Sequence, residues 1–163
     1  MKAWQDYMEP GDMHKMMASW DGAWEMDITH WMEPGAEGAK STATCETKTI
    51  MGGRYSESKH NGNFFGAPFE GLSLMGYDNG KKEFVSTWID NMGTGIMIMT
   101  GTYDAATKTI KMKGTATDPM TGKDVAMRET LQIVDDNTQV MEMYSEVDGK
   151  EFKNMSITMK RKK

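Results

Sequence analysis

The chain has 163 residues, of which 38% are hydrophobic and 26% are charged, and its formal net charge is −5 at pH 7. This length suits a single domain over residues 1–163 that buries enough surface to fold without a disulfide or a structural metal. The acidic balance excludes a typical nucleic-acid binder, and the lone Cys45 excludes an intrachain disulfide. The lack of a long apolar run predicts a soluble, cytoplasmic chain without a signal peptide or membrane span.

The first predicted element is a short helix over about residues 10–20. Pro10 and Asp12 form a helix-start signal, and apolar residues then recur at helical spacing. These residues are Met13, Met16, Met17 and Trp20. An apolar stripe of this kind has to cover another apolar surface, so we expect the helix to close one end of a barrel.

About ten strands are predicted after the helix, because turn residues divide the remaining chain into strand-length pieces. Asn79-Gly80 and Asp148-Gly149 are dipeptides that favour two-residue hairpins. The predicted strands occupy about 22–32, 40–51, 54–65, 69–77, 81–90, 95–103, 108–117, 123–134, 138–147 and 150–161.

The spacing of these strands favours an all-β, antiparallel, up-and-down barrel. No helical segments alternate with the strands, as a parallel sheet would require. Unbroken hairpin connections favour closure, because a closed sheet has no exposed edges. A barrel of about ten strands is wide enough to leave a lumen unless side chains fill it.

Short motifs along the chain resemble the bacterial domain-of-unknown-function family numbered 1579. They are Pro10-Gly11-x-x-His14, Gly22-x-Trp24, Gly52-Gly53-Arg54-Tyr55, Gly76-Tyr77-Asp78, Trp88-Ile89-Asp90, Gly101-x-Tyr103-Asp104, Asp118-Pro119 and Asp148-Gly149-Lys150-Glu151 through Arg161. The resemblance runs from about residue 8 to residue 161. It implies a calycin-like, that is lipocalin-like, barrel and implies no activity.

Methionine is unusually frequent, with 19 residues against only three leucines, at 72, 74 and 131. Its positions in the helix and at alternate positions of the strands favour core and lumen over a metal cluster, and they leave open whether methionine lines an empty lumen or fills a solid interior. Because the methionine side chain is flexible and polarisable, such a lumen would accept ligands of several shapes.

Two strands carry tryptophans at positions that could face the lumen. On the first strand, Trp24 begins an alternating apolar face. On the strand at 83–90, Trp88 and Asp90 share a face, so an inward Trp88 would place the Asp90 carboxylate at the barrel mouth. There Asp90 could bind a ligand or act as an acid or base. The alternative is that Asp90 only begins the following turn.

The strand at 123–134 carries two further charged candidates. Glu129 interrupts an apolar face, so its carboxyl group must be paired, protonated, near an opening or displaced by a bulge. Arg128 with Tyr144 could hold a ligand carboxylate, as in fatty-acid-binding calycins. However, the alternation places Arg128 opposite the apolar face, so an exposed strand arginine is the alternative. Arg54 is a third possible anchor, although Gly52-Gly53 before it is also explained by a bend at a barrel corner.

Metal, cofactor and common catalytic motifs are not predicted. The possible ligands His14, His30, His60 and Cys45 lack metal-ligand spacing, and no nucleophile elbow, phosphate loop or zinc-protease motif occurs.

Three hypotheses remain after these exclusions. The first is binding of a small, largely apolar ligand in the lumen by the residues Trp24, Arg54, Trp88, Asp90, Arg128 and Tyr144. The second is an enzyme that uses Asp90 or Glu129 as acid or base. The third is an interaction scaffold with a filled barrel.

Overall fold

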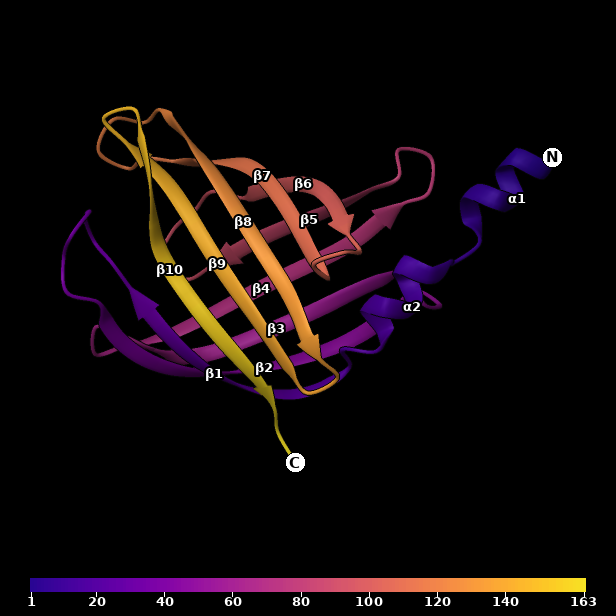
Figure 1. Cartoon of the computed structure of the whole chain (residues 1–163), viewed down its shortest axis with the longest axis horizontal. Helices are drawn as coiled ribbons and strands as arrows, with labels where there is room; N and C mark the ends of the chain where they lie inside the picture. Colours follow the sequence, from indigo (N-terminus) through magenta and orange to yellow (C-terminus); the bar gives the residue numbers. More distant parts are fainter.

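The computed structural model describes all 163 residues, which form two short helices followed by ten strands (Figure 1). The helices are α1 (Lys2–Met8) and α2 (Asp12–Ala18). The strands are β1 (Gly22–His30), β2 (Ala39–Ile50), β3 (Tyr55–Phe64), β4 (Ala67–Asp78), β5 (Glu83–Asp90), β6 (Met97–Asp104), β7 (Thr109–Thr117), β8 (Asp124–Asp135), β9 (Thr138–Val147) and β10 (Lys150–Arg161). None of the helices is both long enough and apolar enough to cross a membrane.

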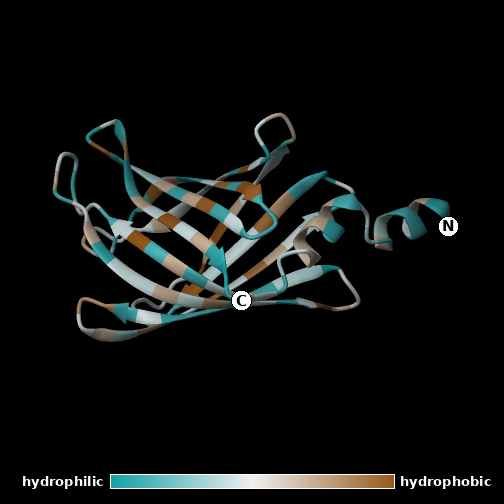
Figure 2. Cartoon of the chain, turned by 60° about the horizontal axis from the view of Figure 1, so that its bottom comes forward, coloured by the Kyte–Doolittle hydropathy of each residue, from teal (hydrophilic) through white to brown (hydrophobic).

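The strands form a closed antiparallel barrel, as the turn pattern predicted. Each strand pairs with its neighbours in the chain, and β1 closes the barrel by pairing with β10, where Met26 lies opposite Met159. Polar and apolar residues alternate along the strands (Figure 2). This alternation lets one face of each strand meet water while the other lies inside the barrel.

Helix α2 closes one end of the barrel, which confirms the prediction made from its apolar stripe. It contacts β2, β3 and β4, and Met17 is only 2% exposed. The buried His14 links the helix to the barrel wall, because its Nδ1 accepts a hydrogen bond from Gly11 N (3.0 Å). The Nε2–H therefore donates to the carbonyl oxygen of Tyr77, 3.1 Å away.

Arg161 at the end of β10 fastens the same end of the barrel. Its guanidinium donates to the carbonyl oxygens of Ser19 (2.8 Å) and Asp21 (2.7 Å), which lie between α2 and β1. It also lies over the Trp24 ring at 4.4 Å from the centroid. These contacts connect the last strand, β10, to the segment between α2 and β1 and to β1 itself.

Helix α1 was not predicted from the sequence, which indicated only the helix at about residues 10–20. It buries none of its residues and extends away from the barrel (Figures 1 and 2). Polar contacts hold its end, because Asn79 Nδ2 donates to Glu9 O (2.8 Å) and Arg54 Nη2 donates to Met8 O (2.8 Å). Arg54 therefore stabilises the outside of the closed end.

Candidate functional site

The barrel encloses a cavity of about 640 Å³, which is within the usual range for small-molecule sites. Its lining runs from Trp20 and Gln139, at the end closed by α2, to Met92 and Ile96 in the loop after β5. Ile96 is 67% exposed, so the cavity opens to solvent at the end opposite α2. The lumen is thus deep, closed at one end and open at the other.

The cavity wall is mainly apolar and rich in methionine. Twenty-one of the 40 lining residues are hydrophobic. The lining methionines are Met26, Met75, Met92, Met97, Met99, Met141, Met143, Met155 and Met159. Almost half of the 19 methionines in the chain therefore face the lumen. Other methionines, such as Met17 and Met112, pack in the core.

Asp90 lies at the cavity wall and also begins a turn. Its Oδ2 accepts a hydrogen bond from Trp88 Nε1 at 2.7 Å, and its Oδ1 accepts one from Met92 N at 2.9 Å. The inward position and the turn position expected from the sequence therefore coexist. Because both carboxylate oxygens already have partners within the chain, Asp90 mainly fixes the orientation of the Trp88 indole.

Five aromatic side chains form a continuous band across β1, β3, β4 and β5, which we call the aromatic strip. They are His30, Phe64, Phe69, Trp88 and His60. Phe69 is stacked on Trp88 with ring centroids 6.2 Å apart. The His60 ring meets Trp88 edge-on at 5.0 Å. All five rings line the cavity. Of these five residues, only Trp88 was predicted from the sequence to bind a ligand.

Gly71 makes room for this strip, and its replacement by alanine is expected to disturb it. A Cβ atom at Gly71 would overlap the Cη2 and Cζ2 atoms of Trp88. Moving the indole would break its bond to Asp90, and overpacking of this kind costs roughly 1–2 kcal/mol. Urea unfolding and the near-ultraviolet circular dichroism of tryptophan should both report the change.

Gly93→Ala is the matched control for this prediction, because nothing lies within 4 Å of the Cβ position at Gly93. If Gly71→Ala retained the parent stability and the parent tryptophan spectrum, the close packing of Trp88 on β4 would be disproved.

Glu129 is the one carboxyl group in the middle of the cavity wall. It lies on β8 between Met112 of β7 and Met143 of β9, and its carboxyl group makes no hydrogen bond or ion pair with another residue. The surface that it keeps accessible faces the cavity. Burial away from bulk water disfavours the ionised form and raises the pKa of Glu129 to about 7. Glu129 therefore carries a carboxyl group that has no partner in the protein and that changes its charge near neutral pH.

Cys45 and His60 lie together in the wall but do not form an activated pair. Their Sγ and Nε2 atoms are 3.8 Å apart. Burial raises the pKa of Cys45 and lowers the pKa of His60 to about 4, so near neutral pH both side chains are uncharged. No three His, Cys, Asp or Glu side chains converge closely enough to hold a metal ion.

The predicted site residues fall into two groups. Trp24, Trp88 and Asp90 line the cavity, whereas Arg54, Arg128 and Tyr144 do not. Arg128 does lie over the Tyr144 ring, with 3.9 Å to the centroid. Its guanidinium, however, forms a two-pronged pair with Glu151 of the same chain, through contacts of 2.6 and 3.0 Å. This arginine is therefore already paired on the outer side of the barrel.

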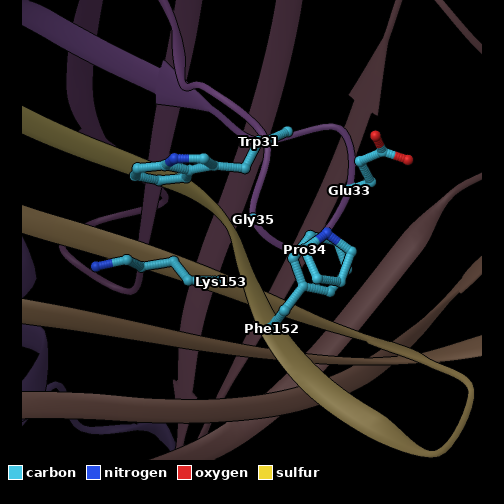
Figure 3. Close-up of a pocket in the computed structure, with 7 residues that line it drawn as sticks. Trp31, Glu33, Pro34, Gly35, Phe152 and Lys153 are labelled. Carbon is cyan, nitrogen blue, oxygen red and sulfur yellow. The ribbon is translucent and has the colours of Figure 1, made fainter.

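A second pocket of about 300 Å³ lies between the β1–β2 loop and β10 (Figure 3). Trp31 and Lys153 extend in the same direction there, and the Lys153 ammonium is 5.6 Å from the Trp31 ring. Lys153 is also paired with Glu142 at 2.9 Å. With only seven lining residues and its cation already paired, this pocket is a weaker candidate than the lumen.

Together these features define a class of protein, a closed ten-stranded antiparallel barrel with one capped end and an internal cavity. The chain belongs to the family described as protein of unknown function (DUF1579), whose family model matches residues 9–161. This membership confirms the resemblance seen in the sequence motifs.

Comparison with solved structures supports the same fold. The chain is similar to the protein in "Crystal Structure of Rv2717c from M. tuberculosis", with a TM-score of 0.70 and 12% identity. The similarity covers 95% of this chain and 100% of that chain. At this identity the likeness concerns the fold alone. No curated protein matches the chain.

Proposed function

We propose that the protein binds a small, largely apolar molecule inside the barrel. The observation that carries this proposal is the cavity of about 640 Å³, which is open at one end and has a mainly apolar wall. An apolar ligand that enters such a cavity leaves water and gains contact with the wall. The same cavity argues against the filled-scaffold hypothesis, because a scaffold has no need of an open lumen.

The methionine-rich wall supports a ligand whose shape is not tightly specified. Methionine side chains have several rotatable bonds and polarisable sulfur atoms, so they adapt to differently shaped apolar groups. The aromatic strip, in contrast, offers a rigid surface near the mouth. The lumen therefore combines an adaptable wall with one fixed contact surface.

An enzyme that uses Glu129 as acid or base is the second candidate function. It is favoured by the pKa of Glu129, which burial raises to about 7, because a general acid or base works best near the operating pH. Asp90 supports this role less, since both of its oxygens already accept hydrogen bonds. Turnover that Glu129→Gln abolishes while ligand binding persists would favour the enzyme.

Filling the lumen from one side chain should block ligand binding. Ser86 lies on the cavity wall next to Trp88, so we expect Ser86→Trp to occupy part of the lumen and weaken binding about tenfold or more. The measurement is native mass spectrometry of freshly purified protein, followed by titration with decanol monitored by tryptophan fluorescence.

Thr87→Trp is the matched control, because Thr87 is the next residue of β5 and does not line the cavity. It should bind like the parent protein, with the fluorescence change referred to each variant's own baseline. Equal binding by the parent and by Ser86→Trp would place the ligand outside the barrel. No bound molecule and no response to apolar compounds would contradict the proposal altogether.

A further inference from the structure

The charged groups on the cavity wall are all acidic. The lining contains Asp90, Asp124 and Glu129 and no lysine or arginine. Its two histidines do not supply compensating charge near neutral pH, because burial lowers the pKa of both His30 and His60. The apolar lumen is therefore an environment that favours positive charge and disfavours negative charge.

We propose that the ligand is an apolar molecule with a protonated amine and that Glu129 accepts hydrogen bonds from this ammonium group. This inference rests on the proposed function, because it names the chemistry of the molecule that the lumen would bind. It distinguishes cationic ligands from carboxylate ligands such as fatty acids, for which Arg128 with Tyr144 was one possible anchor in the sequence.

The position of Glu129 makes an ion pair with such a ligand favourable. A charge buried without a partner is costly, and Glu129 has no partner in the protein. Folding has already removed the carboxyl group from much of the bulk water, so ligand binding has to displace less water from it than from an exposed carboxylate. The methionine side chains around Glu129 also provide an apolar environment, in which a charge-assisted hydrogen bond from an ammonium group to the carboxylate is stronger than the same bond in water.

The aromatic strip supports the same ligand chemistry near the mouth. The faces of tryptophan and phenylalanine rings attract cations within about 6 Å of the ring centroid. A cationic ligand therefore meets favourable groups along the path to Glu129.

A carboxylate ligand would meet the opposite situation. It would lie near Asp90, Asp124 and Glu129 with no cation in the wall to pair with it. The nearest candidate from the sequence, Arg128, is on the outer side and is already paired with Glu151. A long-chain acid should therefore be the poorest of otherwise matched ligands.

Three ligands with the same alkyl chain test the inference, namely decylamine, decanol and decanoic acid. Binding to the parent protein is measured by isothermal titration calorimetry at pH 8 and low salt, below the concentration at which each compound aggregates. We expect decylamine to bind about tenfold or more tightly than decanol, and decanoic acid to bind least.

Glu129→Gln should remove the advantage of the amine while leaving decanol affinity within about twofold of the parent. This variant retains the size and shape of the side chain, and it should fold because it removes a buried ionisable group. Glu25→Gln on the outer face of β1 is the control and should leave all three affinities unchanged, since Glu25 is exposed and does not line the cavity.

The pH dependence of binding provides a second readout. The cross-strand neighbours of Glu129, Met112 and Met143, do not titrate. The other titratable groups on the wall are His30, Cys45, His60, Asp90 and Asp124. Because burial raises the pKa of Glu129 to about 7, the preference for decylamine over decanol should decrease from pH 8 to pH 5.5 in the parent. In Glu129→Gln the preference should not show this decrease.

The outcomes separate this inference from the proposed function. Tighter binding of decanol or decanoic acid than of decylamine would overturn the inference while leaving a ligand-binding barrel. An amine preference that persists unchanged in Glu129→Gln would also overturn it. Failure of all three ligands to bind would overturn the inference together with the proposed function.

Discussion

Replacing Glu129 with glutamine is expected to raise the free energy of unfolding by about 3 kcal/mol at pH 8 and by only about 1 kcal/mol at pH 5. The sign follows from the pKa of the carboxyl group, which burial raises from an ordinary 4.5 to about 7. Between these values the unfolded chain ionises while the folded protein stays protonated. The parent protein therefore loses stability as pH rises from about 4.5 to 7, and the variant escapes this loss.

Urea denaturation at a series of pH values would measure this difference, with the free energy of unfolding extrapolated to water at each pH. Glu25→Gln should run parallel to the parent over the same range, because it removes one acidic residue from an exposed position of β1. A Glu129→Gln curve that also runs parallel to the parent would show that Glu129 is hydrated or paired in solution.

Glu129 could be located from the sequence because it interrupts the alternation of its strand. Strand alternation places every second residue on one face, and a carboxyl group among Met127, Leu131 and Ile133 breaks that pattern. What the alternation could not decide was how the carboxyl group is accommodated. The structure leaves it unpaired and facing a cavity. The same alternation correctly predicted that Trp88 and Asp90 share a face, and both line the lumen.

The fold was predictable because it depends on local signals. Asn79-Gly80 and Asp148-Gly149 mark turns between neighbouring strands, and each strand pairs with the next one in the chain. Closure added only one pairing between distant segments, that of β1 with β10. Helix α1 was missed because its seven residues carry no side-chain cap and bury nothing, so it leaves no apolar pattern in the sequence.

The aromatic strip was not predictable because it depends on the register between strands. Phe69 and Trp88 stack only because β4 and β5 pair in one particular alignment, and Gly71 provides the space. Likewise, the partner of Arg128 is Glu151 on β10, two strands away in the barrel. A sequence pattern within one strand contains no information about such side-chain partners.

Glu129 reduces stability where glutamine would fit the same space. Binding sites often retain groups that lower stability, because a group left without a partner in the free protein is available to a ligand. An amine bound at Glu129 would offset the cost of ionising the carboxyl group. Ligand binding and thermal stability should therefore increase together at pH 8, since a ligand that binds only the folded state stabilises it.

His60 provides the opposite pH dependence in the same cavity wall. Burial lowers the pKa of His60 from 6.5 to about 4, so between these values the unfolded chain binds a proton that the folded protein does not. Stability is therefore lost as pH falls from about 6.5 to 4. His60→Phe keeps an aromatic ring beside Trp88. As pH falls from 8 to 4, its free energy of unfolding should rise by about 3 kcal/mol relative to that of the parent.

The same urea series measures this second prediction, and Cys45→Ser is its control. Cys45 is the sulfur neighbour of His60 at 3.8 Å, so a variant that removes the sulfur but keeps the imidazole should retain the loss of stability in acid. If His60→Phe lost as much stability in acid as the parent, His60 would not be the group responsible for that loss. Because the contributions of His60 and Glu129 have opposite slopes between about pH 4.5 and 6.5, they partly cancel in the parent and become visible only when one of them is replaced.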